Sequence, residues 1–128
     1  TSDYVAKNSL QNNVILVNRP SNEELDWLYS NCNFVIYPSY SEGFGFPILE
    51  AWHYNKLMVC SKSSCLPEIG GNGAMYFDPE NIHDISNLIN EAIGNHTIKE
   101  KTIAEGKIRI AEFTWEKSAK SHLDVLLG

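Results

Sequence analysis

Short runs of mainly apolar residues alternate with longer amphipathic stretches along the chain. Residues 14–17, 34–37, 57–60 and 74–77 each have the length and composition typical of a strand that is buried on both faces. Between and after these runs, apolar residues recur at the three- and four-residue spacing of helices. Because buried strands that alternate with helices form right-handed β-α-β units, the pattern predicts an α/β fold with a parallel sheet and flanking helices.

Capping signals indicate where the first helices begin and end. Ser21 and Glu24 have the spacing of a capping box, which predicts a helix that starts after Ser21. Pro47 is a residue type favoured in the first turn, and it predicts a second helix that begins near it. A third helix is expected to start near residue 82 and to end at Gly94, because glycine is common at helix ends.

Two further helices are predicted in the C-terminal part of the chain, at about residues 97–112 and 114–127. We expect one face of the last helix to pack inward. The residues at helical spacing on that face are Trp115, Ala119, His122, Leu123 and Leu126. Since no repeat, low-complexity tract or linker interrupts the pattern, residues 1–128 are expected to form a single domain.

Charge and composition narrow the possible partners. The formal net charge of −6 disfavours non-specific binding to nucleic acid and offers no polybasic face for anionic membranes. No apolar run approaches the roughly 20 residues of a transmembrane helix, and no signal-peptide pattern is present. Cys32, Cys60 and Cys65 are odd in number and lack metal-ligand spacing, so we expect reduced structural thiols in a cytoplasmic protein.

The segment 39–46 has the composition of a ligand-binding loop. It joins a predicted strand to a predicted helix, and in parallel sheets ligands bind beyond the carboxyl ends of the strands. Gly43 and Gly45 flank Phe44 and allow the backbone to turn sharply and to approach a ligand closely. The helix that follows offers unpaired N–H groups and the positive end of its dipole, which predicts a phosphate site.

Two glutamates lie on either side of this turn, Glu42 before it and Glu50 in the helix. A diphosphate bound to the amides between them would have one carboxylate near each of its ends. Carboxylates accept hydrogen bonds from sugar hydroxyls, often two from one vicinal diol. The pattern therefore favours a ligand that carries hydroxyl groups on both sides of a diphosphate.

These residues carry a resemblance to a known family. Glu42 and Glu50, with seven residues between them, resemble the E-x7-E motif of retaining GT-B glycosyltransferases. The surrounding P-S-x-x-E-G-F-G-F-P-I-L-E-A is similar to the family-four group in particular. Other segments similar to that family are residues 18–25, the L-P-E-I run at 66–69 with Gly71, residues 76–79 and the F-T-W at 113–115.

The resemblance implies a function and a role for each site residue. Such enzymes transfer a sugar from a nucleoside diphosphate sugar to an acceptor and retain the anomeric configuration. Glu42 would be the catalytic residue, which orients the donor sugar, and Glu50 would hold the ribose. The remaining donor-binding positions would be Gly43, Phe44 and Gly45 at the sugar and diphosphate, and Arg19 near the base.

The resemblance also implies a context for the chain. Its 128 residues match part of a Rossmann-like C-terminal domain, so we expect a fragment that is inactive alone, without the acceptor domain and the first β-α part. The acceptor is expected to be a saccharide or a lipid-linked molecule. The donor is a substrate, and no metal or other cofactor is expected. The full-length protein is expected in the cytoplasm, with peripheral binding to the membrane as a further possibility.

A few positions depart from the family pattern. Asn18 stands where glycine is usual, Asn55-Lys56-Leu57 replaces a G-x-P, and Asn72 replaces a common aspartate. These positions concern the geometry of turns more than contacts with a ligand. They therefore bear on the subfamily and leave the fold prediction unchanged.

Other interpretations are open at this point. The chain could be a non-catalytic nucleotide-sugar-binding module, or a purely structural α/β domain in which both glutamates are incidental. The Gly43-Phe44-Gly45 run imitates a dinucleotide fingerprint, but Ile48 occupies the place of its third glycine. Two carboxylates could also serve a glycosidase. We expect Phe46 to be a core residue, and Glu68 to be either a structural acid at the following turn or a ligand contact.

Overall fold

A three-stranded parallel sheet lies at the centre of the computed structural model, which describes all residues from Thr1 to Gly128. Its strands are β1 (Phe34–Tyr37), β2 (Leu57–Ser61) and β3 (Ala74–Phe77), in the order β1-β2-β3. In the register of the sheet, Phe34 lies opposite Leu57, and Met58 lies opposite Ala74. The α/β prediction, with a parallel sheet and flanking helices, is confirmed.

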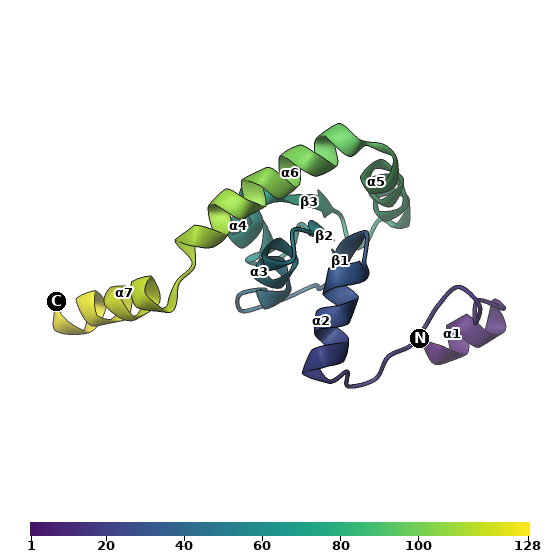
Figure 1. Ribbon diagram of the computed structural model, residues 1–128, viewed down its shortest axis with the longest axis horizontal. Helices are drawn as coiled ribbons and strands as arrows, with labels where there is room; N and C mark the ends of the chain where they lie inside the picture. Colours follow the sequence, from purple (N-terminus) through teal and green to yellow (C-terminus); the bar gives the residue numbers. More distant parts are fainter.

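Helices precede, connect and follow the strands (Figure 1). The capping box of Ser21 and Glu24 is present and starts the second helix, as predicted. The helices are α1 (Ser2–Lys7), α2 (Asn22–Asn31), α3 (Phe46–His53), α4 (Leu66–Gly70), α5 (Ile82–Gly94), α6 (His96–Arg109) and α7 (Trp115–Leu127), with single 3-10 turns η1 (Gly71–Gly73) and η2 (Ile110–Glu112). The short helix α1 was not predicted from the sequence. None of the helices combines the length and the apolar composition needed to cross a bilayer.

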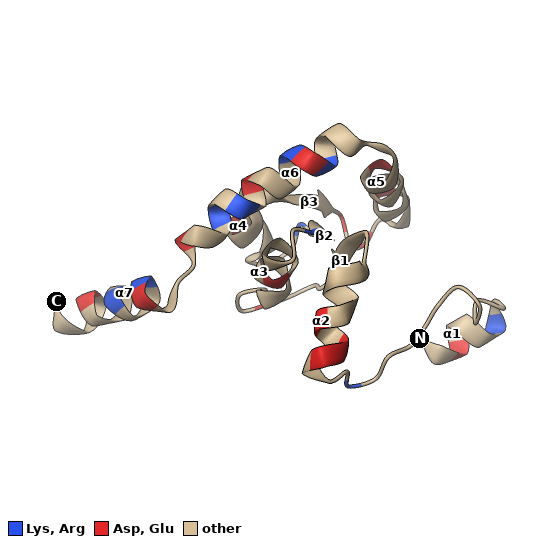
Figure 2. Cartoon of the chain, in the orientation of Figure 1, with Lys and Arg blue, Asp and Glu red and all other residues tan.

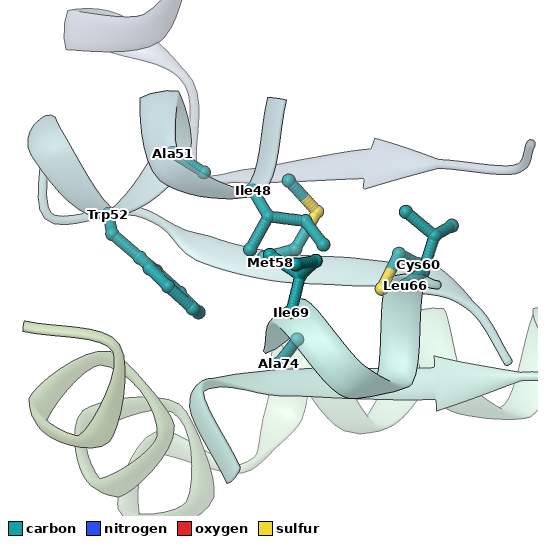
Figure 3. Close-up of a cluster of buried hydrophobic side chains, with 8 residues drawn as sticks. All are labelled: Ile48, Ala51, Trp52, Met58, Cys60, Leu66, Ile69 and Ala74. Atoms are coloured by element: carbon teal, nitrogen blue, oxygen red, sulfur yellow. The ribbon is translucent and has the colours of Figure 1, made fainter. Parts of the chain in front are cut away.

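The middle strand, β2, is buried along its whole length and divides the core in two. Successive side chains of a strand point to opposite faces, so Met58 and Cys60 enter one cluster, while Leu57 and Val59 enter the other. The first cluster, which we name the α3-side core, lies under α3 and α4 (Figure 3). Its buried members are Ile48, Ala51, Trp52, Met58, Cys60, Leu66, Ile69 and Ala74. Helix α5 covers the opposite cluster.

Trp52 joins the α3-side core to α6. Its indole N–H donates a hydrogen bond of 2.7 Å to the carbonyl of Gly73, and its ring is buried. Helix α6 approaches this ring at Gly106, where an added Cβ would lie 2.4 Å from the indole. Such a distance is far inside van der Waals contact, so the close packing of α6 on the core requires glycine at this position.

The strand predicted at residues 14–17 is absent. These residues have no strand assignment, and Ile15 is 87% exposed. A strand forms only where a neighbouring backbone edge offers hydrogen-bond partners, and the three-stranded sheet pairs only β1, β2 and β3. The apolar run has the composition of a strand, but composition does not show whether a partner strand is present.

The predicted inner face of the last helix is also wrong. Helix α7 forms with Thr114 as its N-cap, but none of its residues is buried, and Trp115 is 83% exposed. In Figure 1 it extends away from the sheet at one end of the molecule. An amphipathic face becomes buried only where it packs closely on a complementary surface, and helical spacing alone does not show that such packing occurs.

Asn55 explains one departure from the family pattern. It follows α3 in a left-handed conformation with φ of 55°, which is the region where glycine is most favourable and asparagine is tolerated best among other residues. The chain therefore keeps the same kind of turn into β2 with asparagine in place of glycine.

Substitution of Asn55 should reveal this conformational requirement. We expect Asn55→Ala to lower the free energy of unfolding by about 1 kcal/mol, since alanine is strained in the left-handed region. Asn55→Gly should remain within about 0.5 kcal/mol of the wild type. Urea denaturation measures both values, and equal stability of the two variants would contradict the argument.

A pair of glycine variants tests the packing of α6. Gly106→Ala should lower the free energy of unfolding by about 1–3 kcal/mol, because the new methyl group overlaps the buried indole of Trp52. Gly94→Ala is the matched control, since nothing lies within 4 Å of a Cβ built there. It should leave stability unchanged or raise it slightly through helix propensity. A destabilisation by Gly94→Ala as large as that by Gly106→Ala would rule out the steric explanation.

Candidate functional site

The loops that leave the carboxyl ends of the three strands are tied to one another. The hydroxyl of Ser61, the last residue of β2, donates to the carbonyl of Ser39 in the loop after β1. The hydroxyl of Tyr40 donates to the carbonyl of Pro79 over 3.3 Å, which joins that loop to the one after β3. This edge is where parallel α/β sheets bind ligands.

Gly45 makes the turn that begins α3. It is the N-cap of the helix and has φ of 101°, a left-handed conformation that strongly favours glycine. A Cβ added there would also lie 2.7 Å from the side chain of Leu66. Gly43 has no such constraint, and nothing lies within 4 Å of a Cβ built on it. Of the two predicted glycines, the turn itself therefore depends on Gly45, while Gly43 leaves open space above the backbone.

Four consecutive backbone N–H groups in this turn donate no hydrogen bond within the chain: those of Gly43, Phe44, Gly45 and Phe46. The next residue, Pro47, has no N–H, and the N–H of Ile48 bonds to the carbonyl of Gly45 at 3.0 Å. The four free donors lie at the positive end of the α3 dipole. Together they form a site that suits an anion.

Glu42 is held at the start of this turn. The Ser39 hydroxyl donates to its carboxylate at 2.7 Å. Hydrogen bonds from the Tyr37 hydroxyl, first, and from Ser39 hold the pKa of the Glu42 carboxyl below its ordinary value. Conversely, burial and the hydrogen bond to Glu42 raise the pKa of Tyr37 to about 12. Glu42 is therefore an ionised acceptor at neutral pH.

The backbone of Glu42 is fixed by the loop after β2. The Ser64 hydroxyl donates to the Glu42 carbonyl at 2.9 Å and accepts from its N–H at 3.3 Å. Ser64 itself has φ of 55°, a strained conformation for a residue other than glycine. The Cys65 thiol donates to the same carbonyl at 3.2 Å. Two loops therefore set the place of one carboxylate.

Glu50 lies in α3 and is partly buried. The Tyr29 hydroxyl of α2 donates to its carboxylate at 2.6 Å. Both residues line a cavity of about 370 Å³ between α2, α3 and the segment that follows α6. The other residues that line it are Leu25, Asp26, Leu49, His53, Tyr54, Ile110 and Phe113.

The two glutamates are linked through the same part of the core. Tyr29, which bonds to Glu50, and Tyr37, which lowers the pKa of Glu42, both pack against the α3-side core. Both tyrosines therefore belong to the side of the sheet that α3 covers. Glu42 does not line the cavity beside Glu50.

No hydrogen bond or ion pair joins Arg19 to the loop 39–46. Arg19 is exposed in the turn before α2, in a left-handed conformation with φ of 53°. The placement of Arg19 near a base stays a prediction.

The aromatic residues of the loop divide between core and surface. Phe44 packs against the α3-side core and meets the Phe113 ring edge-on at 5.6 Å. Phe46, predicted as a core residue, is 56% exposed, so that prediction is wrong. Phe46 is the first residue of α3, and no other helix or strand covers its ring. Both rings line a cavity of about 660 Å³ toward α7.

Several contacts in this region were not found from the sequence. The bond from Tyr29 to Glu50 is one of them, and the available signal was that a partly buried tyrosine hydroxyl needs a hydrogen-bond partner. Glu68 is exposed, and only its backbone carbonyl takes part in a hydrogen bond. The turn after α4 is capped instead by Arg109, which donates to the carbonyls of Ile69 at 2.7 Å and Glu68 at 2.6 Å.

Charge elsewhere on the molecule is dispersed. Figure 2 shows Lys and Arg spread over several elements rather than gathered on one face. Lys62, at the carboxyl end of β2, pairs with Asp78 at 3.2 Å. No group of three or more His, Cys, Asp or Glu residues lies together in a way that could hold a metal ion.

Solved glycosyltransferase structures share this fold. Anabaena Alr3699/HepE, solved in complex with UDP and glucose, has a TM-score of 0.84 at 20% identity, over 99% of this chain and 35% of that chain. Sucrose-phosphate synthase from Thermosynechococcus elongatus has a TM-score of 0.83 at 22% identity, over 98% of this chain and 32% of that chain. The C-terminal domain of a Francisella tularensis glycosyl transferase group 1 protein (LpcC) has a TM-score of 0.68 at 24% identity, over 87% and 58% of the two chains. At these identities the likeness establishes the fold, which is that of the C-terminal domain of GT-B glycosyltransferases, as predicted.

Curated proteins of similar sequence are also glycosyltransferases. O-antigen chain mannosyltransferase B of Escherichia coli is 36% identical over 94 residues, which cover 73% of this chain and 25% of that protein. An uncharacterized glycosyltransferase of Methanocaldococcus jannaschii, MJ1178, is 33% identical over 124 residues, which cover 90% of this chain and 33% of that protein. The chain thus spans between a quarter and a third of the length of these relatives. Residues 2–109 match the family described as "Glycosyl transferases group 1". The chain belongs to this glycosyltransferase family.

Proposed function

We propose that this chain is the donor-binding part of a longer, retaining glycosyltransferase that uses a nucleoside diphosphate sugar. The observation that carries the proposal is the row of four free backbone amides between two glutamates whose carboxylates each accept a hydroxyl hydrogen bond, Glu42 from Ser39 and Glu50 from Tyr29. The amides suit a diphosphate, and the carboxylates suit hydroxyl groups on either side of it. UDP bound to Anabaena Alr3699/HepE, a protein of the same fold, supports this assignment.

The proposed reaction moves a glycosyl group between two oxygens. The bond from the anomeric carbon to the phosphate oxygen breaks, and its electron pair leaves with the diphosphate. The acceptor hydroxyl bonds to the same face of the anomeric carbon, so the configuration is retained, and its proton passes to the diphosphate. The amides from Gly43 to Phe46 stabilise the charge that builds on the leaving group, together with basic residues elsewhere in the protein.

Each predicted site residue has a place in this scheme. Glu42 orients the donor sugar through a hydroxyl group, and Glu50 anchors the ribose. Neither acts as a covalent nucleophile. Gly43, Phe44 and Gly45 bind the diphosphate through their amides, and Arg19 lies on the side of the base. No metal is required in this proposal, because hydrogen-bond donors and basic side chains neutralise the diphosphate.

The partners outside the chain are part of the proposal. The acceptor is a saccharide or a lipid-linked molecule bound by another domain of the enzyme, which works in the cytoplasm or at the membrane surface. Because several relatives are mannosyltransferases, the transferred sugar is proposed to be a hexose, and mannose is the first sugar to test. The two rival functions are a non-catalytic nucleotide-sugar-binding module and a purely structural domain.

Nucleotide titration separates these functions. We expect the full-length enzyme to bind at least one of UDP, GDP and ADP in the range of about 1 μM to 1 mM that is common for enzyme substrates. Isothermal titration calorimetry measures the affinity, and a radiolabelled sugar nucleotide measures transfer. Binding without transfer to any acceptor would favour the module, and no binding of the three nucleotides would favour the structural domain.

Substitution of the two glutamates tests their separate roles in the full-length enzyme. Glu50→Gln should raise KM for the donor about tenfold or more, because a hydrogen bond to a charged group contributes about 1.5–3 kcal/mol. Glu42→Gln should lower kcat more than it raises KM, since Glu42 is proposed to act on the reacting sugar. Glu100→Gln, in the exposed face of α6, is the charge-matched control. Steady-state kinetics near wild type for both site variants would show that the roles are wrongly assigned.

A further inference from the structure

Tyr29 contacts Glu50 in a way that the proposed reaction does not by itself require. Its hydroxyl donates to one carboxylate oxygen, Oε2, at 2.6 Å, across 21 residues of sequence. No hydrogen bond from the chain reaches the other carboxylate oxygen, Oε1. We infer that Tyr29 is a positioning residue, which holds Glu50 so that its free oxygen recognises the ribose diol of the donor. This inference rests on the role of Glu50 in the proposed function.

The ring of Tyr29 is fixed from two sides. It stacks on the ring of Tyr54, with centroids 5.3 Å apart and planes inclined by 7°. It also packs against the α3-side core. Tyr54 in turn donates its hydroxyl to Asp26, one turn before Tyr29 in α2. The Tyr29 hydroxyl therefore has a defined position that does not depend on Glu50.

This rigidity matters because Glu50 carries a flexible side chain. A glutamate at a partly buried site has several rotamers, and its binding of a diol requires one of them. Because the Tyr29 hydroxyl has a fixed position, its hydrogen bond selects that rotamer of Glu50 before the ligand arrives. This lowers the entropic cost of binding the ligand. Burial and the bond to Glu50 raise the pKa of Tyr29, so its hydroxyl keeps its proton and remains a donor at neutral pH.

A competing explanation treats the same contact as a simple attachment of α2 to α3. Helix α2 has no buried residue, and the Tyr29 bond and the Lys56 bond to the carbonyl of Ser30 (2.8 Å) are among its few contacts with the rest of the chain. An attachment would affect stability alone. A positioning role would affect ribose recognition even where stability is unchanged, so the two explanations differ in what they predict for deoxynucleotides.

The test compares ribonucleotides with deoxynucleotides in the full-length enzyme. The affinities of UDP, GDP and ADP and of their 2′-deoxy forms are measured for the wild type and for Tyr29→Phe, which keeps the stacked ring. We expect Tyr29→Phe to weaken binding of the best ribonucleotide about tenfold and to leave its 2′-deoxy form within about twofold, because the lost contact acts through the diol. Thermal unfolding checks that the variant is folded.

Two further variants keep the test decisive. Tyr4→Phe removes a hydroxyl from an exposed ring of α1 that touches neither Tyr29 nor Glu50, so the ratio of ribo- to deoxynucleotide affinity should stay at the wild-type value. In the double variant Tyr29→Phe with Glu50→Gln, the loss of ribonucleotide affinity should equal that caused by Glu50→Gln alone, since Tyr29 acts only through Glu50.

The outcomes separate this inference from the proposed function. If Glu50→Gln weakens ribonucleotide binding and Tyr29→Phe does not, the positioning role is overturned while the donor site stands. Equal losses for ribo- and deoxynucleotides in Tyr29→Phe also overturn it. If none of the three ribonucleotides binds the wild type, or Glu50→Gln has no effect, the proposed function fails and the inference fails with it.

Discussion

The left-handed turn at Gly45 is the constraint on which the site depends. Gly45 ends the loop after β1 and starts α3, so the free N–H groups of the turn lie next to the positive end of the helix dipole. A Cβ on Gly45 would lie 2.7 Å from the end of the buried Leu66 side chain, which would have to move. The geometry that exposes the amides is thus the same geometry that packs α3 onto the core.

Strand β2 connects the packing of the core with the hydrogen bonds among the loops at the carboxyl ends of the strands. The alternate side chains of this buried strand fill both core clusters, while its last residue, Ser61, bonds to the backbone of Ser39. The next loop supplies Ser64 and Cys65, which fix the backbone of Glu42. The strained conformation of Ser64 is consistent with a place where function takes precedence over local stability.

Local patterns in the sequence predicted most of what depends on neighbouring residues. The capping box at Ser21 and the strands at 34–37, 57–60 and 74–77 are present because each is decided by short-range spacing and burial. The strand at 14–17 failed because a strand also needs a partner edge, which an apolar run does not encode. The inner face of α7 failed for the same kind of reason, since amphipathicity does not identify the surface that covers it.

The site divides along the same line. Glu42, Gly45 and Glu50 were accessible from the sequence because they lie within one loop and the helix that follows. Tyr29 and Ser64 were not, because each reaches its glutamate across more than 20 residues of chain, and only the fold brings them together. Phe46 was misplaced because its apolar character says nothing about its position at the rim of the sheet.

The central claim is that the backbone amides from Gly43 to Phe46 hold a diphosphate. Selective ¹⁵N labelling of glycine and phenylalanine in the full-length enzyme would allow these amides to be followed by NMR as ligand is added. The account predicts large downfield shifts of these four amide protons with a nucleoside diphosphate and small shifts with the corresponding nucleoside, which lacks the phosphates. Binding of the diphosphate with these four resonances unmoved would contradict it.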